Sequence, residues 1–258
     1  MKDRPVVENV TQTFYDRMAS QYDKFYLDWN MAVREEAAFL RRIFEEHGFD
    51  TSARILDCAC GIGTQAIGLS ALGYSVSGSD ISAAELEEAK RRAEERNVSV
   101  DFHQADFRAL ADVFPEKFDI IIAMDNALPH MLTGDALQSA IRSITAQMRG
   151  GGLFVASIRD YDQMLQEKPK YSAPYVHKTE RGQRVLFQTW DWEGDIYRFI
   201  QYIIDDEDTT QVSRFACAYR ATQREEITVL LHACGCREVV WSMPEETGFY
   251  QPIVTARK

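Results

Sequence analysis

The sequence predicts an α/β protein with a doubly wound, mostly parallel sheet of seven strands that ends in an antiparallel hairpin, together with a small antiparallel β insertion. Three observations predict this fold class. Short apolar segments alternate with helical patterns over 49–160, which is typical of strand–helix units in a parallel sheet. The pattern then changes to consecutive extended segments over 161–221. Finally, two strand-like segments close the chain with no helical pattern between them.

Helical patterns dominate the first part of the chain. Aromatic residues recur at steps of three or four over 9–32, and a second apolar stripe runs from Val33 to Phe44. Gly48 is expected to end the second helix, because glycine readily adopts the left-handed conformation that closes helices.

Strands and helices then alternate along the predicted core. The unbroken isoleucine run in 118–124 predicts a buried strand. Ser82 and Glu85 have the spacing of a capping box at a helix start, and the glycines at 150–152 are expected to end another helix. The predicted strands lie at 55–56, 74–78, 98–102, 118–124 and 153–158, and the predicted helices at 64–72, 82–97 and 133–148.

The rest of the chain is predicted to form a meander, a helix and a hairpin. Thr222 and Glu225 have capping-box spacing, which predicts a helix that runs to about His232. The predicted meander strands lie at 185–192, 196–205 and 213–221, with turns at 193–195 and 205–208, and the hairpin strands at 238–241 and 251–256.

Composition excludes several classes of protein. The formal net charge of −11 repels phosphate backbones, so nucleic acid is not expected as a partner. The adjacent pairs Arg41–Arg42 and Arg91–Arg92 lie in glutamate-rich helical patterns and are interpreted as solvated helix faces. No apolar run approaches the ~20 residues that span a bilayer, and the N-terminus lacks a signal-peptide centre. We therefore expect a cytoplasmic protein without a membrane partner.

The five cysteines do not predict a metal site. Cys58 and Cys60 form one C-x-C pair, and Cys234 and Cys236 form another. Zinc sites ordinarily use C-x₂₋₄-C spacing with further ligands, and the five histidines form no ligand-spaced pair. We interpret the cysteines as small buried residues in a reducing compartment.

A glycine loop follows the first predicted core strand and opens a helix. Gly61 and Gly63 allow a tight turn and the close approach of a ligand to the backbone. Asp80 follows about 20 residues later at the end of the second strand, where a carboxylate can accept both hydroxyls of a ribose. A turn without a ligand is the alternative, and Gly61-x-Gly63-x-x-Ala66 also fits a dinucleotide pattern.

The acidic residues around this loop favour S-adenosylmethionine over a dinucleotide. Asp57 precedes the loop and can meet the ammonium group of S-adenosylmethionine, whereas it would repel the pyrophosphate of a dinucleotide. Asp106 and Phe107 follow the third strand, where they can bind the edge and the face of an adenine.

These residues resemble a class I methyltransferase, a family with a Rossmann-like fold. The likeness rests on D-x-A-C-G-x-G-T at 57–64, on Asp80 and on Asp106, covers roughly 50–160, and agrees with the terminal hairpin. The resemblance implies these cofactor-binding positions in the core: Asp57, Ala59, Gly61, Gly63, Asp80, Ile81, Asp106, Phe107 and Met124.

Two later segments resemble the glycine N-methyltransferase family and its relatives that act on glycine and sarcosine. The segments are 124–131 and 157–165. The resemblance implies that Asn126 and Arg159 hold the substrate carboxylate and that His130 closes over the cofactor. Arg159 also stands just past a central strand, where its guanidinium offers two parallel donors to a carboxylate. The alternatives are an ion pair of Arg159 with Asp160, Asp162 or an insertion glutamate, a turn-stabilising role for Asn126, and a backbone hydrogen bond for His130.

The N-terminal stripe is similar to the aromatic cover of the same family. The resemblance implies that Tyr15, Tyr22 and Tyr26 cover the cofactor and that Arg34 reaches its methionyl carboxylate. Packing of this stripe against the core is the alternative.

The chain departs from the family at Asp125, where the family has a glycine, and at Ala127. Trp190 and Trp192 match nothing in the family. The predicted parts are a helical lid (1–48), a cofactor-binding core (49–160 and 222–258) and a substrate-side insertion (161–221).

The leading hypothesis is S-adenosylmethionine-dependent methyl transfer to the amine of a small carboxylate-bearing substrate such as glycine or sarcosine. Arg159 and Asn126 would anchor the carboxylate and Tyr15 would line the transfer path, while no general base is evident and water would carry the proton away. The alternatives are another small-molecule amine or hydroxyl, a nicotinamide-dependent oxidoreductase, and a non-catalytic cofactor-binding module. The antiparallel insertion is compatible with a homo-oligomer.

Overall fold

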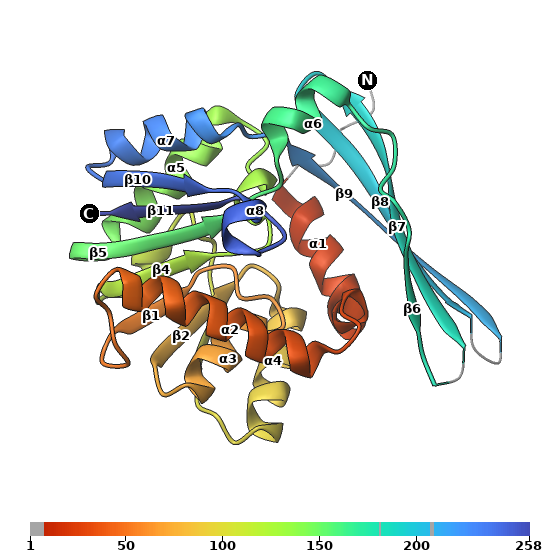
Figure 1. Cartoon of the computed structure of the whole chain (residues 1–258), viewed down its shortest axis with the longest axis horizontal. Coiled ribbons are helices and arrows are strands. Elements are labelled where there is room, and N and C mark those ends of the chain that lie inside the picture. Colours follow the sequence, from red (N-terminus) through yellow and green to blue (C-terminus); the bar gives the residue numbers. More distant parts are fainter. Residues whose placement is uncertain (1–7, 181, 207–208) are drawn as a thin grey trace.

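The computed structural model describes residues 8–180, 182–206 and 209–258. The first seven residues of the predicted lid and residues 207–208 of the predicted turn lie outside this range. A seven-stranded sheet has the order β10-β11-β5-β4-β1-β2-β3 (Figure 1). Its strands are β1 (Arg54–Asp57), β2 (Ser75–Asp80), β3 (Asp101–Gln104), β4 (Phe118–Ala123), β5 (Met148–Ser157), β10 (Arg237–Ser242) and β11 (Ile253–Arg257).

The predicted fold class is confirmed. Strands β1 to β5 pair in parallel, with Ile55 beside both Val76 and Ile120. Strand β11 pairs antiparallel with β5, and β10 pairs antiparallel with β11 at the sheet edge. The final hairpin contains the one-turn helix α8 (Pro244–Thr247), which the sequence analysis did not predict.

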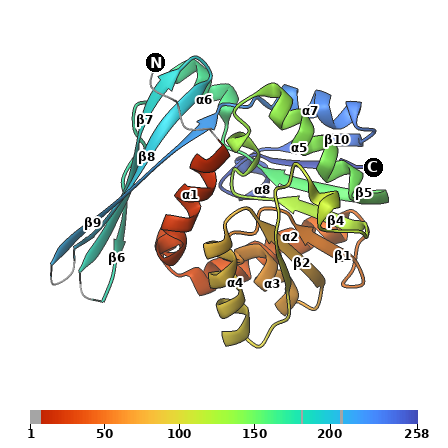
Figure 2. The same ribbon diagram turned by 180° about the vertical axis from the view of Figure 1, so that it is seen from behind.

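Helices cover both faces of this sheet. The alternation of side chains along β4 sends Ile120 and Ile122 to one face and Ile121 to the other. The first face packs against α2 (Trp29–Glu46), α3 (Thr64–Ala71) and α4 (Ala83–Glu95), and the second against α5 (Gly134–Ala146) and α7 (Arg224–Ala233) (Figures 1 and 2). This arrangement is the doubly wound architecture expected from the strand–helix alternation.

Several predicted boundaries were wrong. The glycines at 150–152 lie inside β5, because α5 already ends at Ala146. They fall where the register between β4 and β5 shifts, between the pairs Phe118–Met148 and Ile120–Leu153. Helix α7 has Gln223 as its N-cap, and the Thr222 hydroxyl instead donates to the Arg220 carbonyl. Strand β3 begins at Asp101 rather than at 98, because α4 and its closing turn extend to Val98.

The N-terminal segment forms three elements rather than two helices. Helix α1 (Glu8–Met18) leads into the 3₁₀ helix η1 (Ala19–Phe25), and α2 begins at Trp29, earlier than the predicted second stripe. The Asp28 side chain caps α2 by accepting from the backbone N–H groups of Asn30 and Met31. Helix α1 lies between the core and a second sheet in both views (Figures 1 and 2).

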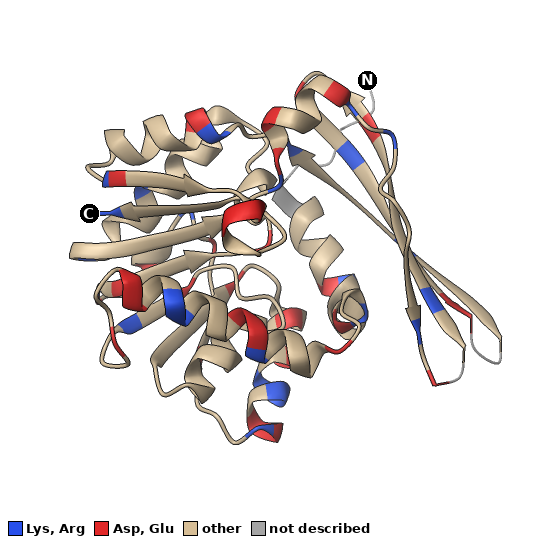
Figure 3. Cartoon of the chain, viewed as in Figure 1, with Lys and Arg blue, Asp and Glu red and all other residues tan. Residues whose placement is uncertain are grey.

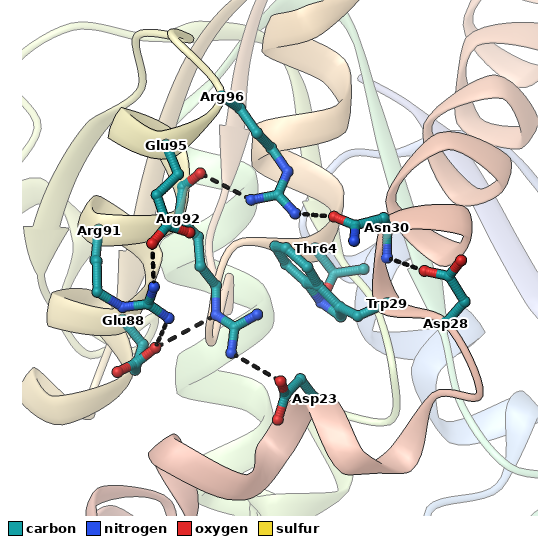
Figure 4. Close-up of polar contacts among 10 residues, drawn as sticks. All are labelled: Asp23, Asp28, Trp29, Asn30, Thr64, Glu88, Arg91, Arg92, Glu95 and Arg96. Carbon is teal, nitrogen blue, oxygen red and sulfur yellow. Dashed lines mark hydrogen bonds and ion pairs between the residues drawn. The ribbon is translucent and has the colours of Figure 1, made fainter. Parts of the chain in front are cut away.

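An aromatic–guanidinium cluster fastens the start of α2 to the core. The Trp29 ring lies between the guanidinium groups of Arg92 and Arg96, each 4.4 Å from the ring centroid (Figure 4). Its indole Nε1 donates to the Thr64 hydroxyl at 2.9 Å, and Arg92 is also ion-paired with Asp23 at 3.2 Å. The prediction that Arg92 belongs to a solvated helix face was therefore wrong: it is 8% exposed.

The insertion forms a separate four-stranded antiparallel sheet of order β6-β7-β8-β9. The predicted meander is confirmed by β7 (Gln183–Glu193), β8 (Ile196–Asp206) and β9 (Thr210–Arg220). The sequence analysis missed α6 (Tyr161–Glu167) and the short edge strand β6 (Tyr175–Lys178). Strand β6 is mostly exposed, so its sequence lacks the apolar alternation that marks a half-buried strand.

Charged residues of both signs are interspersed over the helices (Figure 3). Arg41 is ion-paired with Glu45 along α2, and Arg91 with Glu88 along α4. Within the described ranges, no helix is long and apolar enough to cross a membrane, and no cluster of three or more His, Cys, Asp or Glu side chains has the geometry of a metal site.

Candidate active site

Two cavities open at the carboxyl ends of the parallel strands, where ligands bind in open α/β sheets. The glycine-loop cavity is lined by the loops that follow β1, β2, β3 and β4. The Arg159 cavity, of about 950 Å³, lies between the core, the N-terminal elements and the insertion sheet. Tyr15, Tyr22 and Asp125 line both cavities, so the two are adjacent and meet at these side chains.

The glycine loop is held by the end of β2. The Gly61 N–H donates to Asp80 Oδ2 at 2.9 Å, and the Ser82 N–H donates to Asp80 Oδ1 at 2.9 Å. Gly63 has φ +88°, and a Cβ there would lie 2.8 Å from Ile67 Cδ1. Both the conformation and the space therefore require glycine at 63. Ala59, Gly61 and Asp80 line the cavity as predicted. Gly63 does not line it and instead lies against Ile67 and Ala89.

Asp57 is a buried carboxyl group with an unused oxygen. It is fully buried at the end of β1, its Oδ1 accepts from the Ala59 N–H at 3.4 Å, and its Oδ2 has no hydrogen-bond partner. Burial raises the pKa of Asp57 well above its ordinary value. A cationic group close to the loop would supply the missing partner.

The loop after β3 closes the far end of the glycine-loop cavity. This loop contributes Asp106 and Phe107 to the lining, as the sequence analysis expected. The lining also includes Ile81, which follows β2, and Met124, which follows β4, both as expected. Asp106 also forms an ion pair with Arg108 at 2.5 Å, which fixes its carboxylate at the cavity wall.

The N-terminal aromatic residues divide between the two cavities. Tyr15 and Tyr22 line both, and Tyr26 lines the Arg159 cavity. Arg34, in contrast, is exposed on α2 and donates from Nε to the Asn30 carbonyl one turn earlier. It lines neither cavity, because α2 starts at Trp29 and turns this position toward solvent, so its predicted role at a methionyl carboxylate is not supported.

His130 is a neutral partner of Tyr15. Its Nε2 lies 2.7 Å from the Tyr15 hydroxyl, and its ring lies 4.4 Å from the Tyr219 ring between centroids. Burial lowers the pKa of His130 to about 3, so the imidazole is uncharged near neutral pH. The ring fixes the orientation of the Tyr15 hydroxyl at the junction of the two cavities.

Arg159 is a guanidinium group without a carboxylate partner among the described residues. Nη1 donates to the Tyr197 hydroxyl at 3.0 Å, and both Nη atoms lie 3.2 Å from Gln188 Oε1. Asp160 and Asp162, the predicted alternative partners, are both ion-paired with Arg224. A guanidinium has five N–H donors, so the Nε donor and one Nη2 donor, which share one edge, remain for a ligand.

Asn126 fixes Arg159 in place. Its backbone lies in the left-handed region at φ +70°, its Oδ1 accepts from the Arg159 backbone N–H at 3.0 Å, and its Nδ2 donates to the Tyr161 hydroxyl at 2.9 Å. The amide thereby links the loop after β4 to the loop after β5. One Nδ2 hydrogen remains for a ligand, because Asn126 also lines the Arg159 cavity.

Asp125 anchors an acidic group that the sequence analysis did not predict. Its Oδ2 accepts from Gln65 Nε2 at 2.7 Å, and the same nitrogen lies 2.6 Å from Glu36 Oε2. Its Oδ1 accepts from the Tyr250 hydroxyl at 2.5 Å. Burial raises the pKa of Glu36 from 4.5 to about 9, with a further contribution from the Asp125 charge. The sequence offered no signal for this group beyond the departure from the family at Asp125.

Trp190 and Trp192 also have places in the structure. Trp190 Nε1 donates to Gln188 Oε1 at 2.8 Å, and its ring packs against Arg159. Trp192 Nε1 donates to the Pro169 carbonyl at 2.7 Å, away from both cavities. Gln188 and Tyr197 were missed as well, because they reach Arg159 only through the register of the insertion sheet.

Solved methyltransferases share this fold. An S-adenosylmethionine-dependent methyltransferase from Clostridium acetobutylicum superposes with a TM-score of 0.75 at 17% identity, covering 94% of this chain and 98% of the other. The S-adenosylmethionine-bound amino pentose methyltransferase CalS10 from Micromonospora echinaspora superposes with a TM-score of 0.71 at 18% identity, covering 100% and 99%.

Sequence comparison agrees with the fold. A family model described as a methyltransferase domain matches residues 55–152. A glycine/sarcosine N-methyltransferase from Parasynechococcus marenigrum is 28% identical over 62% of this chain, and a second from Aphanothece halophytica is 22% identical over 83%. Residues 55–152 therefore match a methyltransferase domain, and the chain has the fold of S-adenosylmethionine-dependent methyltransferases. The aligned region spans 55% of the Parasynechococcus protein and 76% of the Aphanothece protein.

The methyltransferase domain match ends before the residues that define the Arg159 cavity. Asn126 lies within it, whereas Arg159, Gln188 and Tyr219 lie beyond residue 152. The domain match and the fold neighbours therefore support S-adenosylmethionine as the cofactor, whereas the acceptor must be inferred from the cavity itself.

Proposed function

We propose that this methyltransferase transfers a methyl group to the amine of a small acceptor that carries a carboxylate. The observation that carries the proposal is the unpaired edge of Arg159. A charged guanidinium in the wall of a cavity needs an anionic partner, and an acceptor carboxylate supplies one with the matching two-oxygen geometry. The similarity to glycine/sarcosine N-methyltransferases supports the same class of acceptor.

The residues of the glycine-loop cavity fit S-adenosylmethionine. Gly61 leaves its wall without a side chain, and Asp80 stands at the end of β2. Asp57 is not part of the lining: it lies buried directly before Cys58 and Ala59, which are, and its Oδ2 has no partner among the described residues. When bound, the cofactor supplies an activated methyl group on a sulfonium. We propose that Asp57 meets the cofactor ammonium, that Asp80 binds its ribose, and that Asp106 and Phe107 bind its adenine.

The chain's own residues then align the acceptor. Arg159 and the remaining Asn126 hydrogen would hold the carboxylate, so that the amine points toward Tyr15 and Tyr22 where the two cavities meet. The His130 contact keeps the Tyr15 hydroxyl oriented at that junction. Alignment and exclusion of water account for most of the rate that such a site can provide. Of the predicted lid (1–48), α1 and η1 border the cavities and are proposed to exclude water, whereas α2 packs against the sheet.

A larger amine is the second candidate acceptor. The Arg159 cavity of about 950 Å³ greatly exceeds the space that glycine needs, and its walls include Phe14, Phe187, Trp190 and Phe199. Asp125 replaces the glycine of the glycine family at the junction, which also changes the surroundings of the amine. This observation favours a carboxylate-bearing amine with an apolar body over glycine itself.

Mass spectrometry of reaction mixtures tests the proposal. The protein would be incubated with S-adenosylmethionine and, separately, with glycine, sarcosine, larger amino acids and amino sugars that lack a carboxylate. We expect S-adenosylhomocysteine and a methylated product only with carboxylate-bearing amines. Turnover of the amino sugars alone would contradict the proposal while leaving the cofactor assignment intact.

A further inference from the structure

Glu85 is a buried acid in the glycine-loop cavity that none of the roles above uses. It lies in the first turn of α4, its backbone N–H donates to the Ser82 hydroxyl at 3.1 Å, and the residue is 1% exposed. It lines the cavity, and its Oε1 has no hydrogen-bond partner. An unpaired buried carboxyl group destabilises the folded protein unless a ligand pairs with it.

Three neighbouring donors already bond to other carboxylates. The backbone N–H groups of Gly61 and Ser82 donate to the two oxygens of Asp80, and the Ser82 hydroxyl donates to Asp16 at 2.6 Å. No Lys, Arg or His of the described chain is ion-paired with Glu85. Burial raises the pKa of Glu85 well above its ordinary value, with further contributions from Asp80 and Asp16. Within the part of the chain that the structure describes, Oε1 of this carboxyl group therefore has no donor.

The position of the carboxyl group indicates the missing donor. Glu85 Oε2 lies 3.4 Å from the point where a Gly61 Cβ would stand, so the group lies over the bare backbone of the glycine loop. Asp80 borders the same part of the cavity and already accepts a backbone hydrogen bond on each oxygen. Hydroxyl groups on a ribose held between the loop and β2 are donors of the required kind.

We propose that Glu85 is a second ribose-binding carboxyl group, which accepts a hydrogen bond from one hydroxyl of S-adenosylmethionine beside Asp80. The inference depends on the cofactor and not on the proposed acceptor, so the two can fail separately. It adds a residue to the cofactor site that the sequence analysis treated only as part of a capping box.

Calorimetric titration tests this assignment. S-adenosylhomocysteine and its 2′-deoxy and 3′-deoxy analogues would be titrated into the wild type and Glu85→Met, with Glu87→Gln, an exposed position on α4, as the matched control. Removing the acceptor of a buried hydrogen bond is equivalent to roughly ten- to hundredfold in a dissociation constant. We expect Glu85→Met to bind S-adenosylhomocysteine at least about tenfold more weakly than the wild type does. For the deoxy analogue that lacks the hydroxyl bonded to Glu85, the two proteins should have the same affinity.

Three results would overturn the assignment. Unchanged S-adenosylhomocysteine binding by Glu85→Met would remove the interaction altogether. Equal weakening for the parent compound and both analogues would indicate a packing role. Weakened binding of S-adenosylmethionine with unchanged binding of S-adenosylhomocysteine would indicate attraction to the sulfonium instead of the ribose.

A stability measurement separates binding from structure. A residue kept for ligand binding is expected to lower stability when the ligand is absent, so Glu85→Met should unfold at a higher temperature than the ligand-free wild type. A purely structural Glu85 would give a lower unfolding temperature. If Glu85→Met does not fold, Glu85→Gln, which keeps the size of the side chain, replaces it in the titrations. Glu85→Gln should bind S-adenosylhomocysteine several-fold more weakly than the wild type does. This difference should disappear for the analogue that lacks the bonded hydroxyl.

Discussion

At the scale of a single residue, the proposed carboxylate-bearing acceptor depends on Arg159. Replacing it with glutamine removes the charge and the free edge while keeping a polar side chain. We expect Arg159→Gln to lower kcat/KM for the best carboxylate acceptor by roughly 100-fold or more, because truncating one partner of a buried charge pair is costly. The dissociation constant of S-adenosylhomocysteine should stay unchanged, since Arg159 does not line the glycine-loop cavity.

The exposed Arg198 on β8 offers a matched control for this change. Steady-state kinetics of Arg198→Gln should match the wild type. Equal losses in the two variants, or a loss of cofactor binding in Arg159→Gln, would show that the defect is structural and would remove Arg159 from the acceptor site.

Gly63 tests the glycine loop at the same scale. Gly63 and Gly48 both have positive φ, at +88° and +80°, but only a Cβ at 63 meets other atoms within 4 Å. We expect Gly48→Ala to lower the free energy of unfolding by about 1 kcal/mol through its conformation alone. Gly63→Ala should cost a further 1–3 kcal/mol, roughly, through overpacking against Ile67, and should weaken S-adenosylhomocysteine binding. Urea unfolding would measure both, and equal costs would contradict the packing argument.

At the scale of elements, the Trp29 cluster joins the N-terminal segment to the glycine loop. Trp29→Phe removes the buried hydrogen bond to Thr64, whose side chain borders the glycine-loop cavity. We expect the free energy of unfolding to fall by about 1–3 kcal/mol and the affinity for S-adenosylhomocysteine to fall with it. Urea unfolding and calorimetric titration would measure the two effects.

Trp241 provides the control for this element. Its Nε1 donates to the Thr228 hydroxyl at 2.9 Å, away from both cavities. Trp241→Phe should therefore lower stability to a similar extent and leave cofactor binding unchanged. If both variants weaken binding equally, the Trp29 cluster has no special connection to the site.

The apolar periodicity of the sequence predicted the helices and strands that bury one or two of their faces. It failed for segments that have no apolar repeat. The isoleucine run of β4 and the alternating strands β7 to β9 were predicted because burial sets their side-chain pattern. The exposed strand β6 and the break at Tyr26 before α2 were missed, since neither has a distinctive apolar repeat. The glycines at 150–152 suggested a helix end, but they stand inside β5 where its register with β4 shifts.

At the scale of the whole molecule, the site is assembled from segments far apart in the sequence. The motif positions around the glycine loop were predictable because one strand–helix unit fixes them locally. The partners of Arg159 and the Glu36–Gln65–Asp125 group were not, because they depend on how the insertion and α2 are placed over the sheet. Arg34 shows the same limit: it resembles an arginine of the glycine N-methyltransferase family, but its position on α2 turns it toward solvent.

The buried acids predict a pH dependence of stability. The pKa of Glu36 is about 9 in the folded protein and 4.5 ordinarily, so between these values the folded state holds a proton that the unfolded state has lost. Stability must therefore fall as pH rises through this range. We expect Glu36→Gln to raise the free energy of unfolding at pH 8, by on the order of 1–2 kcal/mol, and to have little effect near pH 4.5.

Urea unfolding of the ligand-free protein at pH 5, 7 and 8.5 would measure this dependence. The exposed Glu94 on α4 supplies the control, and Glu94→Gln should leave the pH profile as it is in the wild type. A profile that Glu36→Gln does not flatten would show that Glu36 is ionised in the folded protein.

The most direct test of the central claim compares an acceptor with its own primary amide. Methylation of the best amino acid acceptor and of the corresponding amino acid amide would be followed by mass spectrometry, with the wild type and with Arg159→Gln. The account predicts that the wild type prefers the carboxylate by at least roughly 100-fold and that Arg159→Gln loses most of this preference. Equal turnover of acid and amide by the wild type, or an undiminished preference in the variant, would contradict it.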